Sequence, residues 1–303
     1  MRALLLMNLF FLCKQSFSQS DSILLKRHVD YLCHFAEERN ASSIEILNDA
    51  AQYIHDAFEQ YATSTFYQRY EISGQVYRNV LASFGPPRSR RLIIGAHYDA
   101  KGMGADDNAS GIAALLELAR LLQAVDSNLA YRIDLVAWSG GETASDKPRN
   151  MGSYKHALSL HDASVPVVGV LQLESIGYYS DSIRSQRYPL FFYRDFHGSK
   201  GNFTALYERL GMGVFGGMMK SLFKQYSKVH LLSFKPLIRF KKFETNDFRS
   251  FVRFEYPVLL ITDTGKFRNK NLHTTFDSPD RLNYHRIMQL VDMIFQSVIR
   301  FRE

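Results

Sequence analysis

The segment R-L-I-I-G-A-H-Y-D (91–99), followed by G-A-D-D-N-A-S-G (104–111), carries most of the information about the fold. Its first half is a short apolar run, which is typical of a buried strand. The second half closes a polar loop and leads into a stretch rich in Ala and Leu that predicts a helix over about 109–124. A buried strand, a loop and a helix in this order form the repeating unit of an α/β protein.

The same alternation continues on both sides of this segment. Residues 64–84 predict two strands, and residues 21–62 show helical periodicity in two runs. Downstream we expect strands at 132–138, 166–173, 189–193 and 256–262, and helices near 151–160, 202–210, 215–227, 246–253 and 284–301. This pattern predicts an α/β fold with a single domain, in which a mixed, mostly parallel, twisted β-sheet has helices on both faces.

The first eighteen residues form a separate segment. One early Arg is followed by an apolar run that ends near Leu12, and small residues stand at Ser16 and Ser18. This arrangement predicts a signal peptide over residues 1–18 and a mature domain over 19–303, exported to the periplasm or secreted. After the signal only Cys33 remains, so the sequence predicts no intramolecular disulfide.

Composition and charge exclude several other classes of protein. The chain has 303 residues, of which 46% are hydrophobic and 22% charged, as in a packed globular protein. The net charge is +7, but the basic residues are spread along the chain. Nucleic-acid binding normally needs a concentrated basic stripe, so we expect no nucleic-acid partner. No segment after the signal is apolar for long enough to insert stably in a membrane.

Polar side chains gather just after the predicted buried strands, where the ligands of α/β sheets bind. They are His97 with Asp99, Asp106 with Asp107, Glu142, Glu174 and, in a later loop, His273. Imidazole and carboxylate groups are the ligands of catalytic zinc sites, and two zinc ions can share a bridging carboxylate. From these residues alone a metal site is one interpretation; a helix cap at Asp107 is another.

The order of the motifs resembles the zinc aminopeptidase and glutaminyl cyclase family of co-catalytic zinc exopeptidases. G-A-H-Y-D and G-A-D-D-N-A-S-G are followed by W-S-G-G-E (138–142), L-E-S-I-G (173–177) and H-T-T-F-D (273–277). The resemblance implies two zinc ions, or one, with a peptide or another small substrate bearing an N-terminal amine. It implies His97, Asp107, Glu142, Glu174 and His273 as metal ligands, with Asp107 as the bridge. Asp99 is placed to support the His97 imidazole.

Three positions depart from the family pattern. The family has two adjacent glutamates in the third motif, a general base and then a ligand, where this chain has Gly141 and Glu142. Leu272 stands where many relatives have a tyrosine that can stabilise an oxyanion. In N-D-F (246–248), Asp247 is retained as a group that could support the site, while Phe248 replaces a histidine.

Two functions from different classes follow from these observations. The first is a zinc-dependent exopeptidase that hydrolyses N-terminal residues from peptides by metal-activated water, with Glu142 also moving the proton. The second is a zinc-binding homologue that binds peptides or has a structural role without turnover. A glutaminyl cyclase-like acyl transfer is a third interpretation, and it needs the same missing base.

Overall fold

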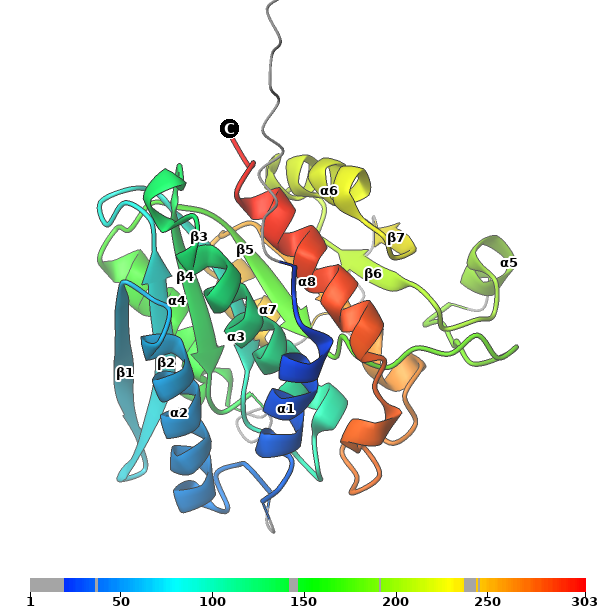
Figure 1. Ribbon diagram of the computed structural model, residues 1–303, viewed down its shortest axis with the longest axis horizontal. Helices are drawn as coiled ribbons and strands as arrows, with labels where there is room; N and C mark the ends of the chain where they lie inside the picture. The colour runs from blue at the N-terminus through cyan, green and yellow to red at the C-terminus, as the bar shows by residue number, and fades with distance from the viewer. Residues whose placement is uncertain (1–18, 36–37, 142–146, 191, 237–243, 245) are drawn as a thin grey trace, which may run out of the picture.

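The computed structural model describes residues 19–303 except 36–37, 142–146, 191, 237–243 and 245 (Figure 1). Its strands are β1 (Ser64–Ile72), β2 (Gln75–Phe84), β3 (Arg91–His97), β4 (Arg132–Trp138), β5 (Val167–Glu174), β6 (Thr204–Tyr207), β7 (Leu231–Phe234) and β8 (Val258–Thr262). Its α-helices are α1 (Ser22–Leu32), α2 (Ile44–Glu59), α3 (Ser110–Gln123), α4 (Gly152–Asp162), α5 (Tyr193–His197), α6 (Phe215–Tyr226), α7 (Asn246–Val252) and α8 (Tyr284–Val298).

The eight strands form one mixed sheet in the order β1-β2-β4-β3-β5-β8-β6-β7. β4, β3, β5 and β8 run parallel at its centre, while β1, β2 and the β8–β6 pair contribute the antiparallel contacts. The predicted α/β class and mostly parallel sheet are therefore confirmed. Because the central strands are parallel, their carboxyl ends, including His97 and Glu174, lie at one edge of the sheet.

Helices cover both faces of this sheet, as Figure 1 shows. On one face α1, α2, α3, α6 and α8 pack on a large apolar core that includes Leu92 and Ile94 of β3. On the other face α4 and α7 pack on a smaller core that includes Ile93 and Trp138. Successive residues of β3 thus point to opposite cores, which explains why a strand buried on both sides reads as a continuous apolar run.

Two sequence predictions near the far edge of the sheet are wrong. Residues 202–210 are not a helix, because Thr204–Tyr207 forms β6, which pairs with both β8 and β7 and is fully buried. Residues 189–193 are not a strand, since Tyr193 begins the short helix α5 and residues 189–190 lie outside any strand. The four-residue strand β7 was not predicted. Tertiary pairing outweighs local propensity in such short segments.

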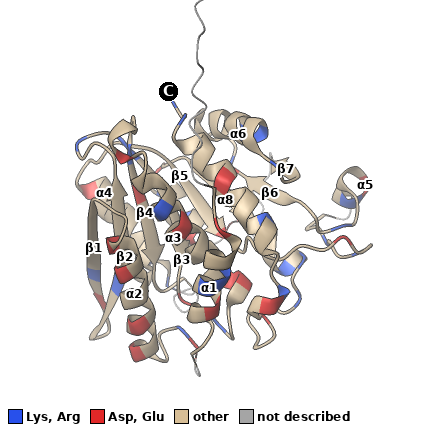
Figure 2. Cartoon of the chain, viewed as in Figure 1, with Lys and Arg blue, Asp and Glu red and all other residues tan. Residues whose placement is uncertain are grey.

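Charged residues are interspersed on the elements visible in Figure 2, where both signs occur on neighbouring helices. Within the described part of the chain, no helix is long and apolar enough to span a membrane. Cys33 is a free thiol. The predicted signal peptide, residues 1–18, lies outside the described residues.

Candidate metal centre

Asp107 lies between two imidazole rings at the carboxyl edge of the central strands. Its Oδ2 lies 2.9 Å from His273 Nε2, and its Oδ1 lies 3.2 Å from His97 Nε2. Burial alone would raise the pKa of Asp107, but the hydrogen bond with His273 and the closeness of the His97 and His273 imidazoles outweigh it and hold this pKa well below its usual range. One carboxylate that presents each oxygen to a different imidazole has the arrangement of a ligand shared by two metal positions.

Glu174 and Asp247 complete a second group around His97. One ligand atom from each of His97, Glu174 and Asp247 lies within 4.8 Å of the other two, and His97 and Asp247 are buried. The pKa of Glu174 is raised to about 7, chiefly by burial and with a contribution from the carboxylates of Asp107 and Asp247, although the charge of His97 opposes the rise. Several desolvated carboxylates at one point favour binding of a divalent cation.

The orientation of the His97 ring is fixed by the residue that follows its strand. His97 Nδ1 lies 2.9 Å from the backbone carbonyl of Asp99, which can only accept, so Nδ1 donates this hydrogen bond. The other nitrogen, Nε2, therefore faces Asp107 and Glu174. The Asp99 carboxylate is more distant, at 3.6 Å from Nδ1. The predicted supporting role of Asp99 thus falls mainly on its backbone oxygen, because the chain turns directly after β3.

A layer of buried polar groups holds the Asp107 segment in place. Asp277 Oδ2 accepts the backbone N–H groups of Asp106 and Asp107, each at 3.2 Å. Asn269 Nδ2 donates to both Asp106 Oδ2 and Asp277 Oδ1. The Asn108 side chain links the same segment to the end of β5, because its Nδ2 donates to the carbonyl of Leu173. These contacts fix the position of the Asp107 carboxylate before any metal binds.

Asp277 and Asn269, which both contact the Asp107 segment, were not predicted as site residues from the sequence. Asp277 is the last residue of the quoted motif H-T-T-F-D, so its position in that motif was the available signal. The sequence predicts Asp247 only as a supporting group, whereas the structure places it directly in the His97–Glu174 group. Asn269 carries no sequence signal, since only the folded chain brings it to the Asp107 segment.

The departures from the family pattern also lie at this centre. A β-carbon on Gly141 would lie 3.2 Å from His97 Cβ and Cγ, so this glycine is packed against the His97 side chain. Leu272 is buried beside His273 and supplies no hydroxyl group. Glu142, predicted as both a ligand and a proton carrier, lies outside the described residues.

The described residues fit a bound zinc ion. Asp107 Oδ1 is buried and accepts no hydrogen bond of good geometry from the described chain. A buried carboxylate oxygen without a donor is costly, and a cation at this point would satisfy it. The imidazole nitrogens and carboxylate oxygens around it are the ligand types that zinc takes.

Solved structures of known proteins share the fold of this chain. The fold is zinc exopeptidase-like. The LapA aminopeptidase of Legionella pneumophila superposes with a TM-score of 0.73, at 18% identity, over 92% of this chain and 71% of that one. The glutaminyl cyclase of Tannerella forsythia superposes with a TM-score of 0.66, at 18% identity, over 94% of this chain and all of that one. At these identities the likeness establishes the fold alone.

Sequence comparison gives the family. Residues 79–298 match the model of peptidase family M28, and the chain belongs to this family, whose members typically bind zinc. It is also 34% identical over 283 residues to the uncharacterized protein YfbL of Escherichia coli, covering 88% of this chain and 84% of YfbL.

Proposed function

We propose that this protein is a zinc-dependent exopeptidase that removes N-terminal residues from peptides. The observation that carries the proposal is the buried Asp107 carboxylate, with one oxygen facing His97 and the other facing His273. Family membership supports peptide substrates. The predicted signal peptide supports action outside the cytoplasm, and export is part of the proposal.

The residues divide into two groups of ligands that share Asp107. His97, Glu174 and Asp247 would hold one zinc ion together with Asp107. His273 and, by resemblance to the family, Glu142 would hold the other. Bound zinc would supply a polarised carbonyl oxygen and a water of lowered pKa. The chain's own contribution is to orient His97 through Asp99 and to keep the Asp107 segment rigid through Asp277.

The proton taken from water needs an acceptor from the chain. Gly141 has no side chain, so the position of the family's general base contributes nothing to this transfer. A positioned base contributes roughly 10²–10⁴ in rate, or about 3–5 kcal/mol of barrier. We assign the role to Glu142, which follows Gly141 directly, and expect a slower enzyme than relatives with two adjacent glutamates.

The test combines metal content with substrate turnover. The protein without residues 1–18 is dialysed against chelator and reloaded with zinc, and the release of free amino acids from aminoacyl and dipeptide substrates is then measured. The proposal predicts release that needs zinc and disappears in His97→Ala. A wild type that binds no zinc and releases no amino acid from any substrate would contradict it.

Two departures from the family pattern favour a second candidate function, a zinc-binding protein that binds peptides without turnover. Gly141 and Leu272 each remove a group that relatives use in the reaction. The Gly141→Glu variant separates the two functions. Activity that appears only in this variant would favour the second, because the remaining residues would then be competent while the natural chain is not.

A further inference from the structure

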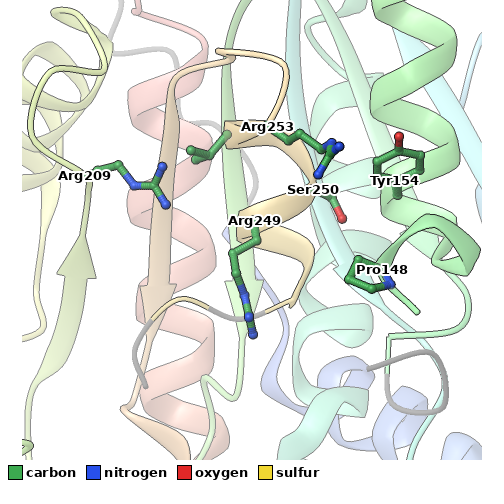
Figure 3. Close-up of a pocket in the computed structure, with 7 residues that line it drawn as sticks. Pro148, Tyr154, Arg209, Arg249, Ser250 and Arg253 are labelled. Carbon is green, nitrogen blue, oxygen red and sulfur yellow. The ribbon is translucent and has the colours of Figure 1, made fainter. Parts of the chain in front are cut away.

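A cavity of about 280 Å³ lies beside α7, on the face of the sheet that α4 and α7 cover. Figure 3 shows three arginines arranged around α7, with Tyr154 and Pro148 facing them from the region of α4. The described residues that line this cavity are Pro148, Tyr154, Arg209, Arg249, Ser250, Val252 and Arg253. No carboxylate is among them.

The three arginines contribute differently to the charge of the cavity. Arg209 donates to both oxygens of the buried Glu244, through Nε at 3.0 Å and Nη2 at 2.9 Å, so its guanidinium is fixed and its charge is balanced. The Arg253 guanidinium lies 5.9 Å from the centre of the Tyr154 ring and makes no ion pair with the described residues. The side chain of Arg249, which lies on α7 four residues before Arg253, is exposed. The cavity is therefore lined by positively charged side chains, and the guanidinium of Arg209 is held in place on one side of it.

The cavity and the metal centre both border α7. Asp247, in the first turn of this helix, belongs to the group around His97, while Ser250 and Arg253 line the cavity. Arg253 continues the helical turn, because its N–H donates to the carbonyl of Arg249. At about 1.5 Å per residue, Asp247 and Arg253 are separated by about 9 Å along the helix axis. An extended peptide covers this distance in about three residues.

Two described residues that follow β4 in the sequence also lie at the metal centre and at the cavity. Gly141 packs against His97, and Pro148, seven residues further along the chain, lines the cavity. Ser153 of α4 donates to Ser250 of α7 at 3.0 Å, which joins the two walls of the cavity. The two walls of the cavity are thus joined, and one of them, α7, also carries Asp247 at the metal centre.

We propose that this cavity binds the carboxylate group of a short peptide, two or three residues beyond the N-terminal residue that lies at the metal centre. The inference rests on the proposed exopeptidase function and adds a preference for short or acidic peptides. A carboxylate fits because guanidinium groups bind it with charge-assisted hydrogen bonds. Its source is either the C-terminus of a tripeptide or an acidic side chain, and the test separates them.

The test measures binding to metal-free protein by calorimetry, so that hydrolysis does not enter the result. The probes are Leu-Ala-Ala as the free acid, Leu-Ala-Ala amide and Leu-Ala-Glu amide. We expect the free acid to bind the wild type at least about tenfold more tightly than the plain amide. Tight binding of the Glu-containing amide as well would show that a side-chain carboxylate is accepted; if only the free acid binds tightly, the site reads the C-terminus.

Arg253→Met, and the double variant Arg249→Met with Arg253→Met, should bring the free acid and the amide to equal affinity. Arg88→Met is the matched control, because Arg88 is also exposed but lies in the loop between β2 and β3, outside the cavity. It removes the same charge and should keep the preference. Melting temperatures verify that each variant folds.

Three results would overturn the inference. They are equal affinity of the wild type for acid and amide, no detectable binding of either peptide, and a preference that survives in the double arginine variant. Inorganic phosphate that binds the cavity while the peptides show no preference would indicate a simple anion site and also contradict it. Zinc-dependent hydrolysis of the amide, measured separately, would leave the proposed function standing in any of these cases.

Discussion

The backbone N–H of Gly141 donates a hydrogen bond of 3.0 Å to Asp99 Oδ1. Asp99 in turn accepts from the His97 ring through its backbone carbonyl. Gly141, at the position of the family's general base, is thus linked to the His97 ring through Asp99, and it has no side chain. Relative to the family pattern, Gly141 therefore lacks a basic side chain at a point close to His97 and Asp99.

Gly141→Glu should increase the rate of peptide hydrolysis by about tenfold or more, because it supplies a carboxylate next to the ligands. The gain should stay below that of an ideal base, since the new β-carbon comes within 3.2 Å of His97 and the ring must shift slightly. Gly141→Gln is the control, with the same size and no basic group. Equal rates in the Glu and Gln variants would show that no base acts from this position.

Asp107→Asn should weaken binding at both metal positions, because Asp107 faces His97 and His273 with separate oxygens. We expect zinc affinity to fall by more than about 100-fold, beyond the usual effect of residues that only support a ligand. Zinc per chain after dialysis, measured by mass spectrometry, tests this. Asp162→Asn, on an exposed side chain, should retain the wild-type zinc content.

Asp247→Asn should lower affinity for one zinc ion while leaving the other bound. Asp247 groups with His97 and Glu174, not with His273. In metal-free protein the same variant should not lower the melting temperature, since the charge of Asp247 raises the pKa of the buried Glu174 and its removal relieves this repulsion. A variant with full zinc content would show that Asp247 is not a ligand.

The buried His156 should make stability dependent on pH in metal-free protein. Trp138 Nε1 donates to His156 Nδ1 at 3.1 Å, and burial lowers the pKa of His156 to about 4, from about 6.5 when unfolded. A neutral buried histidine stabilises the fold above pH 6.5, and this contribution falls progressively between pH 6.5 and 4, by up to about 3 kcal/mol.

His156→Gln should therefore flatten the decrease in the free energy of unfolding over this range, because glutamine cannot be protonated there. Urea unfolding at a series of pH values measures the effect. His161→Gln changes an exposed histidine of the same helix and should leave the wild-type slope. An unchanged slope in His156→Gln would remove His156 as its cause.

The central strands and the polar residues at their ends were predictable because both are local in sequence. A buried strand that ends in a polar residue, such as β3 with His97, shows its structure and its chemistry in one short segment. The parallel order of the strands then brings their ends together, so the contact of His97 with Glu174 follows from the pattern.

Other features depend on the folded chain. The strand β6 (Thr204–Tyr207) has residues that also suit a helix, and only its pairing with β8 decides between them. The closeness of Asp247 to Glu174 results from the packing of α7 on the sheet, which no local pattern encodes. Asp277 supports Asp107 from 170 positions away in the sequence, so its role could not be read from spacing.

The most direct test of the account is the release of N-terminal amino acids by the zinc-reloaded wild type, measured alongside its zinc content. We expect zinc to remain bound after dialysis of the reloaded protein and amino acids to be released. We also expect chelator or His97→Ala to abolish the release. The proposed function would be contradicted if the folded wild type retains no zinc and if neither the wild type nor the Gly141→Glu variant releases amino acids.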